Sequence, residues 1–377
     1  MIPQSIVMPY HRNKEMLLYT TQLLCASIPD EVEIIVVGNN SDEKELDVDL
    51  PERIRYYKFQ ESLLYSQTVN KGVALAHGEI VTLCDQDIFG FDDWYQPLLK
   101  KLLSSDSIGA VSGKLLNPIN DRIIDFGIEY SPRRIVHPLR GLKSNHPLAL
   151  SDRKVTSSTS AILMMRKATY EKVGGMDLDM PYCCSDCDIG IKIGKIGLEN
   201  WVVSEAVAYH RGSSSTKNGK SSSFSYLKYD SDKMFWVKNY AQLQPTVVSY
   251  IQASFHFLQD SSHRDFPKLY QFINLSTTDE YKWYAQKLTE ISGISIAGIY
   301  SYPQRCDHYS SFELQIYDAV PYTFMNDSVP LIFFVDYFPS LIGCNMIWSH
   351  MRNPRNDLVM DVHGNILSMQ DVLDGRA

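Results

Sequence analysis

The chain has 377 residues, of which 44% are hydrophobic and 21% are charged, and its formal net charge is −8. This composition is typical of a soluble globular protein and excludes an intrinsically disordered one. The acidic balance argues against a nucleic-acid binder, which would carry an excess of Lys and Arg. The length favours two domains, which we place at residues 1–240 and 241–377.

The first half of the chain alternates strand and helix patterns. We expect strands at Ser5–Met8, Glu33–Val37 and Glu79–Leu83, and helices at Asn13–Ser27, Ser66–His77 and Trp94–Leu103, the last capped by Asp92 or Asp93. Strands that alternate with helices predict a parallel α/β sheet. Ligands of such sheets bind beyond the carboxyl ends of the strands.

From residue 110 onward the pattern becomes mixed. Further strands are expected at Val111–Leu116, Arg122–Tyr130 and Ser160–Met165, with a basic loop at Ser131–Lys154 and a Gly/Ser-rich loop at Gly212–Ser223. Both loops are interpreted either as solvated surface or as a clamp and a lid over an anionic ligand. In the last third, a helix at Asp279–Ile291 and strands at Ile294–Tyr300 and Leu331–Tyr337 predict a smaller α/β or α+β appendage.

The N-terminus and the cysteines bear on the compartment. Residues 1–8 lack a charged segment followed by an apolar one, so we expect no signal peptide. Seven scattered cysteines favour reduced thiols in a cytoplasmic protein. Cys184 and Cys187 have CxxC spacing but no second Cys or His pair, which favours ordinary thiols over a zinc site. The apolar stretch Val329–Trp348 is interrupted by prolines and an aspartate, so we expect buried strands rather than a membrane span.

The predicted strand at Glu79–Leu83 leads into Asp85-Gln86-Asp87. Strand side chains alternate between faces, so both carboxylates would point the same way. Such oxygen ligands suit Mg²⁺ or Mn²⁺, which usually take further ligands from substrate phosphates. The pattern alone is weak, because Asp-x-Asp recurs at residues 47–49, 177–179 and 186–188, and a solvated turn is the alternative.

Several segments, in this order, resemble the inverting glycosyltransferases of family 2 over roughly residues 3–240. They are Ile6–Arg12, Glu33–Ser41, Asn70–Gly72, Asp85–Asp87, Gly174–Asp177, Ser185–Asp188 and Ala206–His210. The resemblance implies the GT-A fold, a Rossmann-like mixed sheet flanked by helices. It also implies metal-dependent transfer of a sugar, with inversion, from a nucleoside-diphosphate sugar to a hydroxyl of a glycan or lipid-linked acceptor.

The resemblance assigns roles to individual residues. It implies that Asp186 is the general base and that Asp85, Asp87 and His210 bind Mn²⁺ or Mg²⁺. It further implies that the donor is contacted by Pro9, Tyr10, His11, Arg12, Asn39, Asn70, Lys71 and Asp85. These roles make chemical sense, because the acceptor hydroxyl must lose a proton and the leaving diphosphate gains charge that a cation stabilises.

Plainer interpretations remain open for the same residues. Asp186 and Asp188 could cap a helix that begins near Ile189, and His210 could be a structural histidine. Two departures from the family pattern also matter. Gly38 stands where many members have an acidic residue that recognises the base or ribose, so a dTDP-sugar remains an alternative to the favoured UDP-sugar. Ser185 replaces a glutamate beside the catalytic aspartate.

Two other functions compete with sugar transfer. A sugar-1-phosphate nucleotidyltransferase would need a glycine-rich loop after its first strand, and Pro9–Lys14 contains no glycine. The presence of Asp85, Asp87, Asp186 and His210 together weighs against the second alternative, a catalytically silent carbohydrate-binding subunit. The family resemblance implies an enzyme of bacterial surface-polysaccharide synthesis. It also implies a location in the cytoplasm or peripherally at the inner face of the cell membrane.

Overall fold

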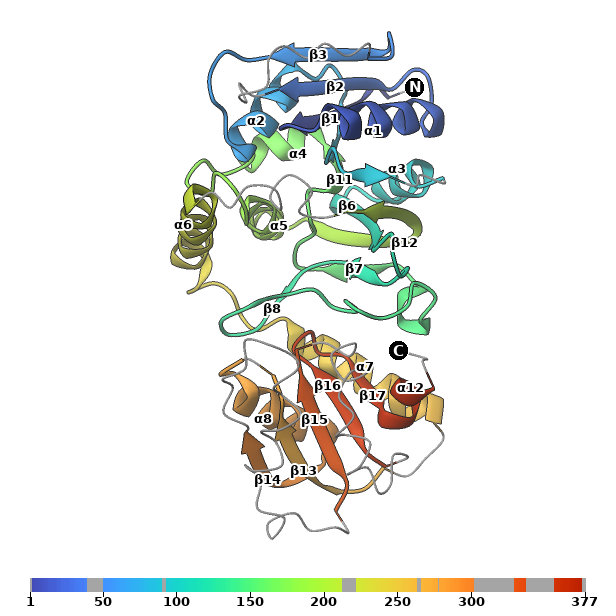
Figure 1. Cartoon of the computed structure of the whole chain (residues 1–377), viewed down its shortest axis with the longest axis vertical. Helices are drawn as coiled ribbons and strands as arrows, with labels where there is room; N and C mark the ends of the chain where they lie inside the picture. The colour runs from blue at the N-terminus through green and yellow to red at the C-terminus, as the bar shows by residue number, and fades with distance from the viewer. Residues whose placement is uncertain are drawn as a thin grey trace. The chain divides into compact units, whose positions relative to one another are not determined.

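The computed structural model describes residues 2–38, 50–89, 93–211, 222–262, 266–276, 278–301, 329–336 and 356–374. The chain forms two compact units (Figure 1). The first comprises Met1–Ile128 and Ala149–Leu243, and the second comprises Glu129–Leu148 and Gln244–Ala377. The second unit thus includes a segment, Glu129–Leu148, that our division at residue 240 places in the first domain. The catalytic and accessory roles given to the two domains stay predictions.

The first unit is built on one mixed sheet with the strand order β10-β12-β6-β11-β4-β1-β2-β3. These strands are β1 Gln4–Tyr10, β2 Glu33–Gly38, β3 Ile54–Lys58, β4 Ile80–Cys84, β6 Ile108–Leu116, β10 Arg153–Val155, β11 Ile162–Arg166 and β12 Glu199–His210. Two short strands join it, since β5 Ile88–Phe89 pairs with β12 and β7 Ile123–Asp125 pairs with β6. Strands β1, β2, β3, β4, β6 and β12 run in one direction, so their carboxyl ends meet at one edge.

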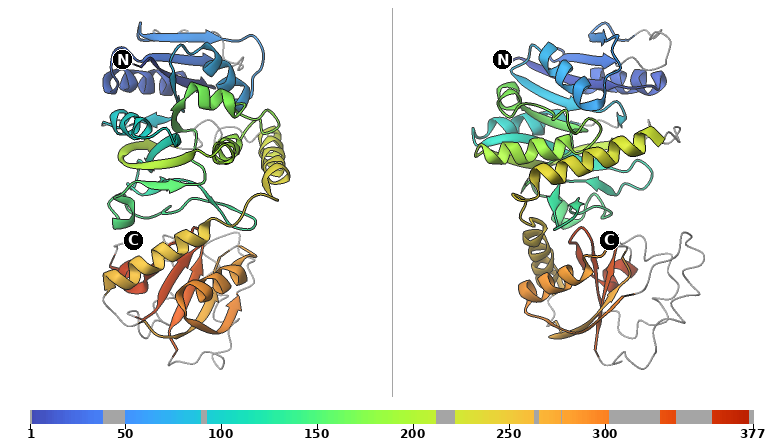
Figure 2. Two further views of the ribbon diagram at one scale, coloured as in Figure 1. Left: turned by 180° about the vertical axis from the view of Figure 1, so that it is seen from behind. Right: turned by 90° about the vertical axis from the view of Figure 1, so that its left-hand side faces the viewer.

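Helices cover both faces of this sheet (Figure 2). One face is covered by α1 Lys14–Ser27 and α3 Tyr95–Leu103, and the other by α2 Tyr65–Leu75, α4 Lys167–Lys172 and α5 Ser185–Lys195. Strand β1 shows why helices cover both faces, because it has apolar side chains on each: Ile6 and Met8 pack toward α1 and α3, and Val7 packs toward α2 and α5. A strand buried on both faces is mainly apolar, and β1 contains such an apolar run from Ile6 to Met8. The predicted α/β class, with a mixed sheet flanked by helices, is confirmed.

Some local predictions are wrong. The strand expected at Arg122–Tyr130 is two strands, β7 and β8 Glu129–Tyr130, because Gly127 between them has a φ of +100°, which breaks the extended run. The prediction that Asp93 caps α3 is also wrong, because the N-cap residue is Trp94, and its side chain makes no capping hydrogen bond. Asp92 lies outside the described residues.

The second unit has its own sheet, in the order β14-β13-β15-β16-β17. Strands β13 Leu269–Asn274, β14 Ser295–Ser301, β15 Leu331–Val335 and β16 Leu358–Asp361 are parallel, and β17 Ile366–Ser368 is antiparallel. Helices α7 Val247–Ser262 and α8 Tyr281–Ser292 pack into one apolar cluster with this sheet, and α12 Met369–Leu373 follows β17. The segment Glu129–Leu148 adds the hairpin of β8 and β9 Ile135–Val136 and the start of the 3₁₀ helix Pro147–Ala149. Of the two classes left open for the appendage, the parallel strands establish α/β.

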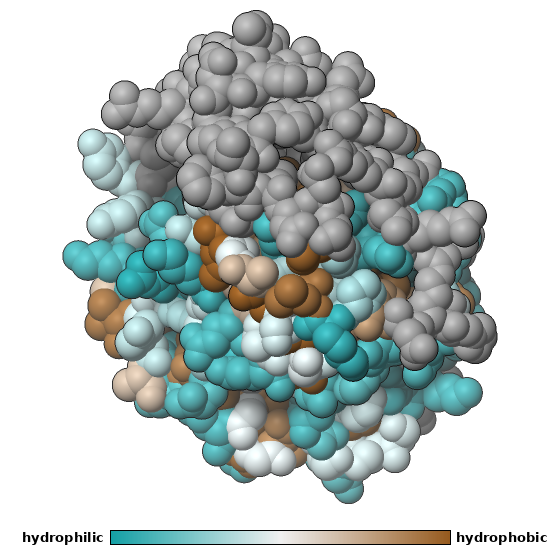
Figure 3. Space-filling view, turned by 90° about the horizontal axis from the view of Figure 1, so that it is seen from below, coloured by the Kyte–Doolittle hydropathy of each residue, from teal (hydrophilic) through white to brown (hydrophobic). Residues whose placement is uncertain are grey.

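Helix α6 Ser222–Asn239 completes the first unit and packs beside α5. Within the described part of the chain, no helix is both long and apolar enough to cross a membrane. The described residues on the face seen in Figure 3 are mainly hydrophilic, with hydrophobic residues in small groups.

Candidate active site

The three predicted metal ligands lie together at the carboxyl edge of the first sheet. Asp85 directly follows β4, and Asp87 directly precedes β5. His210 is the last residue of β12 and stands opposite Ile88 of β5. One ligand atom from each of Asp85, Asp87 and His210 lies within 4.8 Å of the other two. His210 Nε2 is 3.1 Å from Asp87 Oδ1.

The electrostatics of this cluster favour a bound cation. Burial, followed by the charge of Asp87, raises the pKa of Asp85 to about 6. Burial by itself lowers the pKa of His210, but the hydrogen bond to Asp87 and the two carboxylates outweigh it and raise that pKa. Two carboxylates crowded at a buried site repel each other unless positive charge lies between them. Two carboxylates and an imidazole therefore suit a divalent cation such as Mn²⁺ or Mg²⁺.

The predicted nucleotide-binding turn, residues 9–12, is connected by Gln86 to the segment that carries the candidate metal ligands Asp85 and Asp87. The Gln86 Oε1 atom accepts the His11 N–H at 2.7 Å, and its Nε2 atom donates to the Arg12 carbonyl at 2.8 Å. Arg12 and Asn13 have φ values of 61° and 66°, in the left-handed region that few side chains adopt. The middle residue of the Asp-x-Asp pattern thus orients the turn after β1.

Asp186 is connected to the same cluster through two residues that the sequence did not single out. Its Oδ2 atom accepts the Ser160 N–H at 3.2 Å, and its Oδ1 atom accepts the Cys187 N–H at 2.9 Å. The Ser160 Oγ atom lies 2.8 Å from the Tyr65 hydroxyl, which donates to Asp85 Oδ1 at 2.9 Å. Ser160 and Tyr65 therefore join the predicted base to the predicted metal ligands.

Tyr65 is the first residue of α2 and keeps its proton at this site. Burial and the charge of Asp85 raise the pKa of Tyr65 well above its ordinary value. No sequence pattern marks Tyr65 or Ser160, because the two residues are 95 positions apart and meet only in the fold.

The alternative in which Asp186 and Asp188 cap a helix near Ile189 is wrong. Helix α5 begins at Ser185, its N-cap is Cys184, and both aspartates lie in its first turn.

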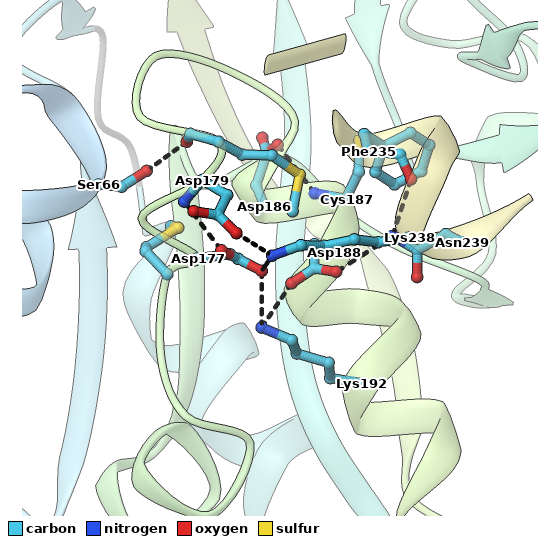
Figure 4. Close-up of polar contacts among 12 residues, drawn as sticks. Ser66, Asp177, Asp179, Asp186, Cys187, Asp188, Lys192, Phe235, Lys238 and Asn239 are labelled. Carbon is cyan, nitrogen blue, oxygen red and sulfur yellow. Dashed lines mark hydrogen bonds and ion pairs between the residues drawn. The ribbon is translucent and has the colours of Figure 1, made fainter. Parts of the chain in front are cut away.

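Asp188 is buried, and it contacts one side chain of α5 and one of α6 (Figure 4). Its Oδ2 atom pairs with Lys192 Nζ at 2.5 Å, one turn along the same helix. Its Oδ1 atom accepts the Asn239 side-chain N–H of α6 at 3.1 Å. Asp188 therefore fastens α6 to α5, whereas Asp186, two residues earlier, faces the metal cluster.

Lys238 makes a second connection from α6. Its Nζ atom lies 2.6 Å from Asp177 Oδ2 and 2.8 Å from Asp179 Oδ2 (Figure 4). A neighbouring residue of this acidic loop, Met180, accepts the Ser66 hydroxyl of α2 through its carbonyl at 2.7 Å. The loop that leads into α5 is thus held from α2 and from α6.

The remaining predicted donor residues have other partners. The side-chain amide of Asn70 bonds to both backbone groups of Met176, at 2.8 Å and 2.9 Å. Lys71 Nζ lies 3.2 Å from Glu61 Oε2 and 4.4 Å from the centroid of the Phe59 ring. Asn39 and residues 212–221 of the expected lid lie outside the described residues. The donor contacts given to these residues stay predictions.

The structure explains why residue 38 is a glycine. Gly38 ends β2 beside Tyr10, and a Cβ atom placed there would lie 2.3 Å from the Tyr56 hydroxyl. Tyr56 of β3 therefore fills the space that an acidic side chain at position 38 would need.

Residues 5–170 match the model of the family described as glycosyl transferase family 2. This segment is a family 2 glycosyltransferase domain. The O-antigen biosynthesis protein RfbC of Myxococcus xanthus is 24% identical over an alignment of 224 residues, and the match covers 56% of this chain and 18% of RfbC. The uncharacterized protein y4gI of Sinorhizobium fredii is 26% identical over an alignment of 227 residues, and the match covers 56% of this chain and 24% of y4gI. The matched part of the chain thus corresponds to less than a quarter of either relative's length.

Among solved structures, GalNAc-T7 with UDP, GalNAc and Mn²⁺ is similar to this chain with a TM-score of 0.48 and 13% identity. The match covers 78% of this chain and 55% of that one.

Proposed function

We propose that this glycosyltransferase moves a sugar from a nucleoside-diphosphate sugar to a hydroxyl of a glycan or lipid-linked saccharide, with inversion at the anomeric carbon. The observation that carries the proposal is the continuous path of contacts from Asp186 through Ser160 and Tyr65 to Asp85. It connects the carboxylate of Asp186 to a cluster of side chains suited to a cation.

The residues of this chain divide the work in the proposed reaction. Asp186 takes the proton of the acceptor hydroxyl as that oxygen attacks the anomeric carbon and the bond to the leaving diphosphate breaks. Asp85, Asp87 and His210 hold Mn²⁺ or Mg²⁺, which supplies Lewis-acid stabilisation of the leaving diphosphate. Tyr65, fixed as a proton donor, restrains Asp85, and Gln86 positions the turn that we expect to contact the nucleotide.

Finer features of the reaction belong to the proposal as well. We favour a uridine nucleotide from the family resemblance, and we keep thymidine as the alternative because Tyr56 fills the space that an acidic residue at position 38 would need. The RfbC relative supports a place in bacterial surface-polysaccharide synthesis. A lipid-linked acceptor would bring the enzyme to the inner face of the cell membrane as a peripheral protein.

The test is a panel of nucleotide sugars incubated with the full chain, Mn²⁺ and simple glycan acceptors. We expect release of one nucleoside diphosphate, and the anomeric configuration of the product should be inverted in its proton NMR spectrum. Release of pyrophosphate from a nucleoside triphosphate would instead identify a nucleotidyltransferase. Binding of saccharide with no release from any donor would identify a silent subunit, and a product with retained configuration would remove Asp186 as the base.

A further inference from the structure

Three cysteines surround the proposed base. Cys183, Cys184 and Cys187 lie within five residues at the N-terminus of α5, and Asp186 stands between the last two. The Cys184 S–H donates to Cys183 Sγ, and the two sulfur atoms are 3.6 Å apart. Neither they nor the other cysteines in the described part of the chain form a disulfide. Sugar transfer as proposed uses none of these thiols.

Cys183 is the more reactive member of the pair. It is half-buried, while Cys184 and Cys187 are buried. The hydrogen bond from Cys184 lowers the pKa of the Cys183 thiol below its ordinary value, against the opposing effects of burial and of Asp186. A thiolate is the nucleophilic form of cysteine, and the N-terminus of a helix also stabilises it.

The same residues connect the base to α6. Cys183 Sγ lies 3.8 Å from the Lys228 carbonyl of α6, and the neighbouring Tyr182 N–H donates to Ser231 Oγ at 3.3 Å. Cys184 has a φ of 66°, so the chain turns sharply as it enters the helix that carries Asp186. A covalent change at these thiols would alter the backbone two residues before Asp186.

We propose that Cys183 and Cys184 form a reversible oxidation site at which a peroxide joins the two thiols and so displaces Asp186. The Cys183 thiolate attacks one peroxide oxygen, so that an S–O bond forms, the O–O bond breaks and the other oxygen leaves as water after protonation. The Cys184 sulfur then attacks Cys183, so that an S–S bond forms and the S–O bond breaks, releasing a second water. Two thiols and one hydrogen peroxide give one disulfide and two waters.

The geometry makes this disulfide both disruptive and easily reversed. The sulfur atoms must approach from 3.6 Å to about 2.05 Å, which requires the peptide between them to move. Neighbouring Cα atoms lie about 3.8 Å apart, below the range of about 4.4–6.8 Å in ordinary disulfides. Strain of this kind raises the reduction potential, so thiol reductants should reopen the bond.

The test treats the reduced full chain with hydrogen peroxide and measures its intact mass and its transfer activity. We expect loss of two hydrogen atoms and a fall in transfer of at least about tenfold, because a shift of about 1 Å in a catalytic group can cost up to about 10² in rate. Dithiothreitol should restore both values. A wild-type protein that keeps all its thiols, or that forms the disulfide without loss of transfer, would overturn the proposal.

Variants identify the thiols. Cys183→Ser and Cys184→Ser should neither lose two hydrogen atoms nor lose activity in peroxide, whereas Cys25→Ser on α1 should remain as sensitive as wild type. A Cys184→Ser protein that still forms a disulfide would place the partner elsewhere and refute the pair. If the Cys184 variant fails to fold, Cys183→Ser still decides the question.

The effect on transfer rests on the proposed function, but the mass change does not. A disulfide that forms in a protein without transferase activity toward the panel would therefore refute the proposed function and keep the oxidation site.

Discussion

Replacement of Asp186 by Asn separates catalysis from structure at the first turn of α5. The Asn side chain has the size of Asp but cannot accept the proton of the acceptor hydroxyl. Loss of a general base lowers the rate by about 10² to 10⁴. Donor affinity should change little, because the proposed metal ligands and the Gln86 contacts to the turn after β1 remain.

The cost of the same change in stability follows from the bonds of Asp186. Its two oxygen atoms accept the Ser160 N–H and the Cys187 N–H, and an Asn side chain can accept only one of them through its oxygen. One hydrogen bond contributes about 0.5–1.5 kcal/mol. Loss of a negative charge at a helix N-terminus costs about 0.3–1 kcal/mol more. Asp186→Asn should therefore lower the free energy of unfolding by about 1–2.5 kcal/mol.

Asp188→Asn is the matched control, since the residue type, helix turn and substitution are the same. Asp188 is 2% exposed and pairs with Lys192, whose side chain is 26% exposed. Removal of one partner of a fully buried pair costs about 3–5 kcal/mol, and the exposure of Lys192 reduces this to about 1–3 kcal/mol. Because Asp188 faces α6, turnover per folded molecule should stay within about threefold of wild type.

Both variants need three measurements: initial rate of nucleoside-diphosphate release, donor affinity by calorimetry, and the free energy of unfolding in urea. The expected result is a large loss of turnover for Asp186→Asn and a loss confined to stability for Asp188→Asn. Near-normal turnover of the Asp186 variant, or equal losses of turnover in both variants, would refute the assignment of the base.

Three further predictions concern other parts of the first unit. With a pKa of about 6, Asp85 is about one-tenth ionised at pH 5, so Mn²⁺ affinity by calorimetry should be about tenfold weaker there than at pH 7. His210, whose pKa is also raised, should add to this fall in affinity. Equal Mn²⁺ affinities at pH 5 and pH 7 would contradict the assignment of Asp85 and His210 as metal ligands. In the transfer assay, excess chelator should abolish transfer and Mn²⁺ should restore it. Gly38→Ala should lower the free energy of unfolding by about 1–3 kcal/mol. The loss should be smaller in a Tyr56→Phe background, because the Tyr56 hydroxyl is the atom nearest to the added Cβ. Equal losses in both backgrounds would show that the strain does not come from this hydroxyl. Lys238→Met should lower the free energy of unfolding, measured by urea titration, by only about 1 kcal/mol despite the two ion pairs of Lys238, because 33% of its side chain is exposed. A much larger loss would show that these ion pairs contribute as strongly as buried ones.

The strands and helices near the site could be predicted because their signals are local. Strand β4 is an apolar run that ends beside two carboxylates, and Asn13 caps α1 by accepting the Met16 N–H at 3.0 Å. The short strand β3 carries no such signal, since Arg55, Tyr56, Tyr57 and Lys58 are exposed or half-buried at the sheet edge. Central strands are buried on both faces and can be predicted from their continuous apolar sequence, whereas β3 is not buried in this way.

The site itself was predictable only in part. Resemblance supplied Asp85, Asp87, Asp186 and His210, and the fold gathers the first two and the last into one cluster. The connection through Tyr65 was not predictable, because a hydroxyl at a helix start has no pattern until the tertiary structure places a carboxylate beside it. Long-range contacts of this kind depend on the register of the whole sheet rather than on any local propensity.

Neutral donors and acceptors orient several of the candidate site residues. The turn before α1 is held by Gln86, and Asp186 accepts the Ser160 and Cys187 N–H groups. Ion pairs connect Asp177 to Lys238 and Asp188 to Lys192. A lysine beside Asp186 would hold its proton affinity down and weaken it as a base, whereas backbone N–H groups orient the carboxylate at a smaller cost in basicity. Orientation of Asp186 by the Ser160 and Cys187 N–H groups is therefore compatible with its proposed role as the base.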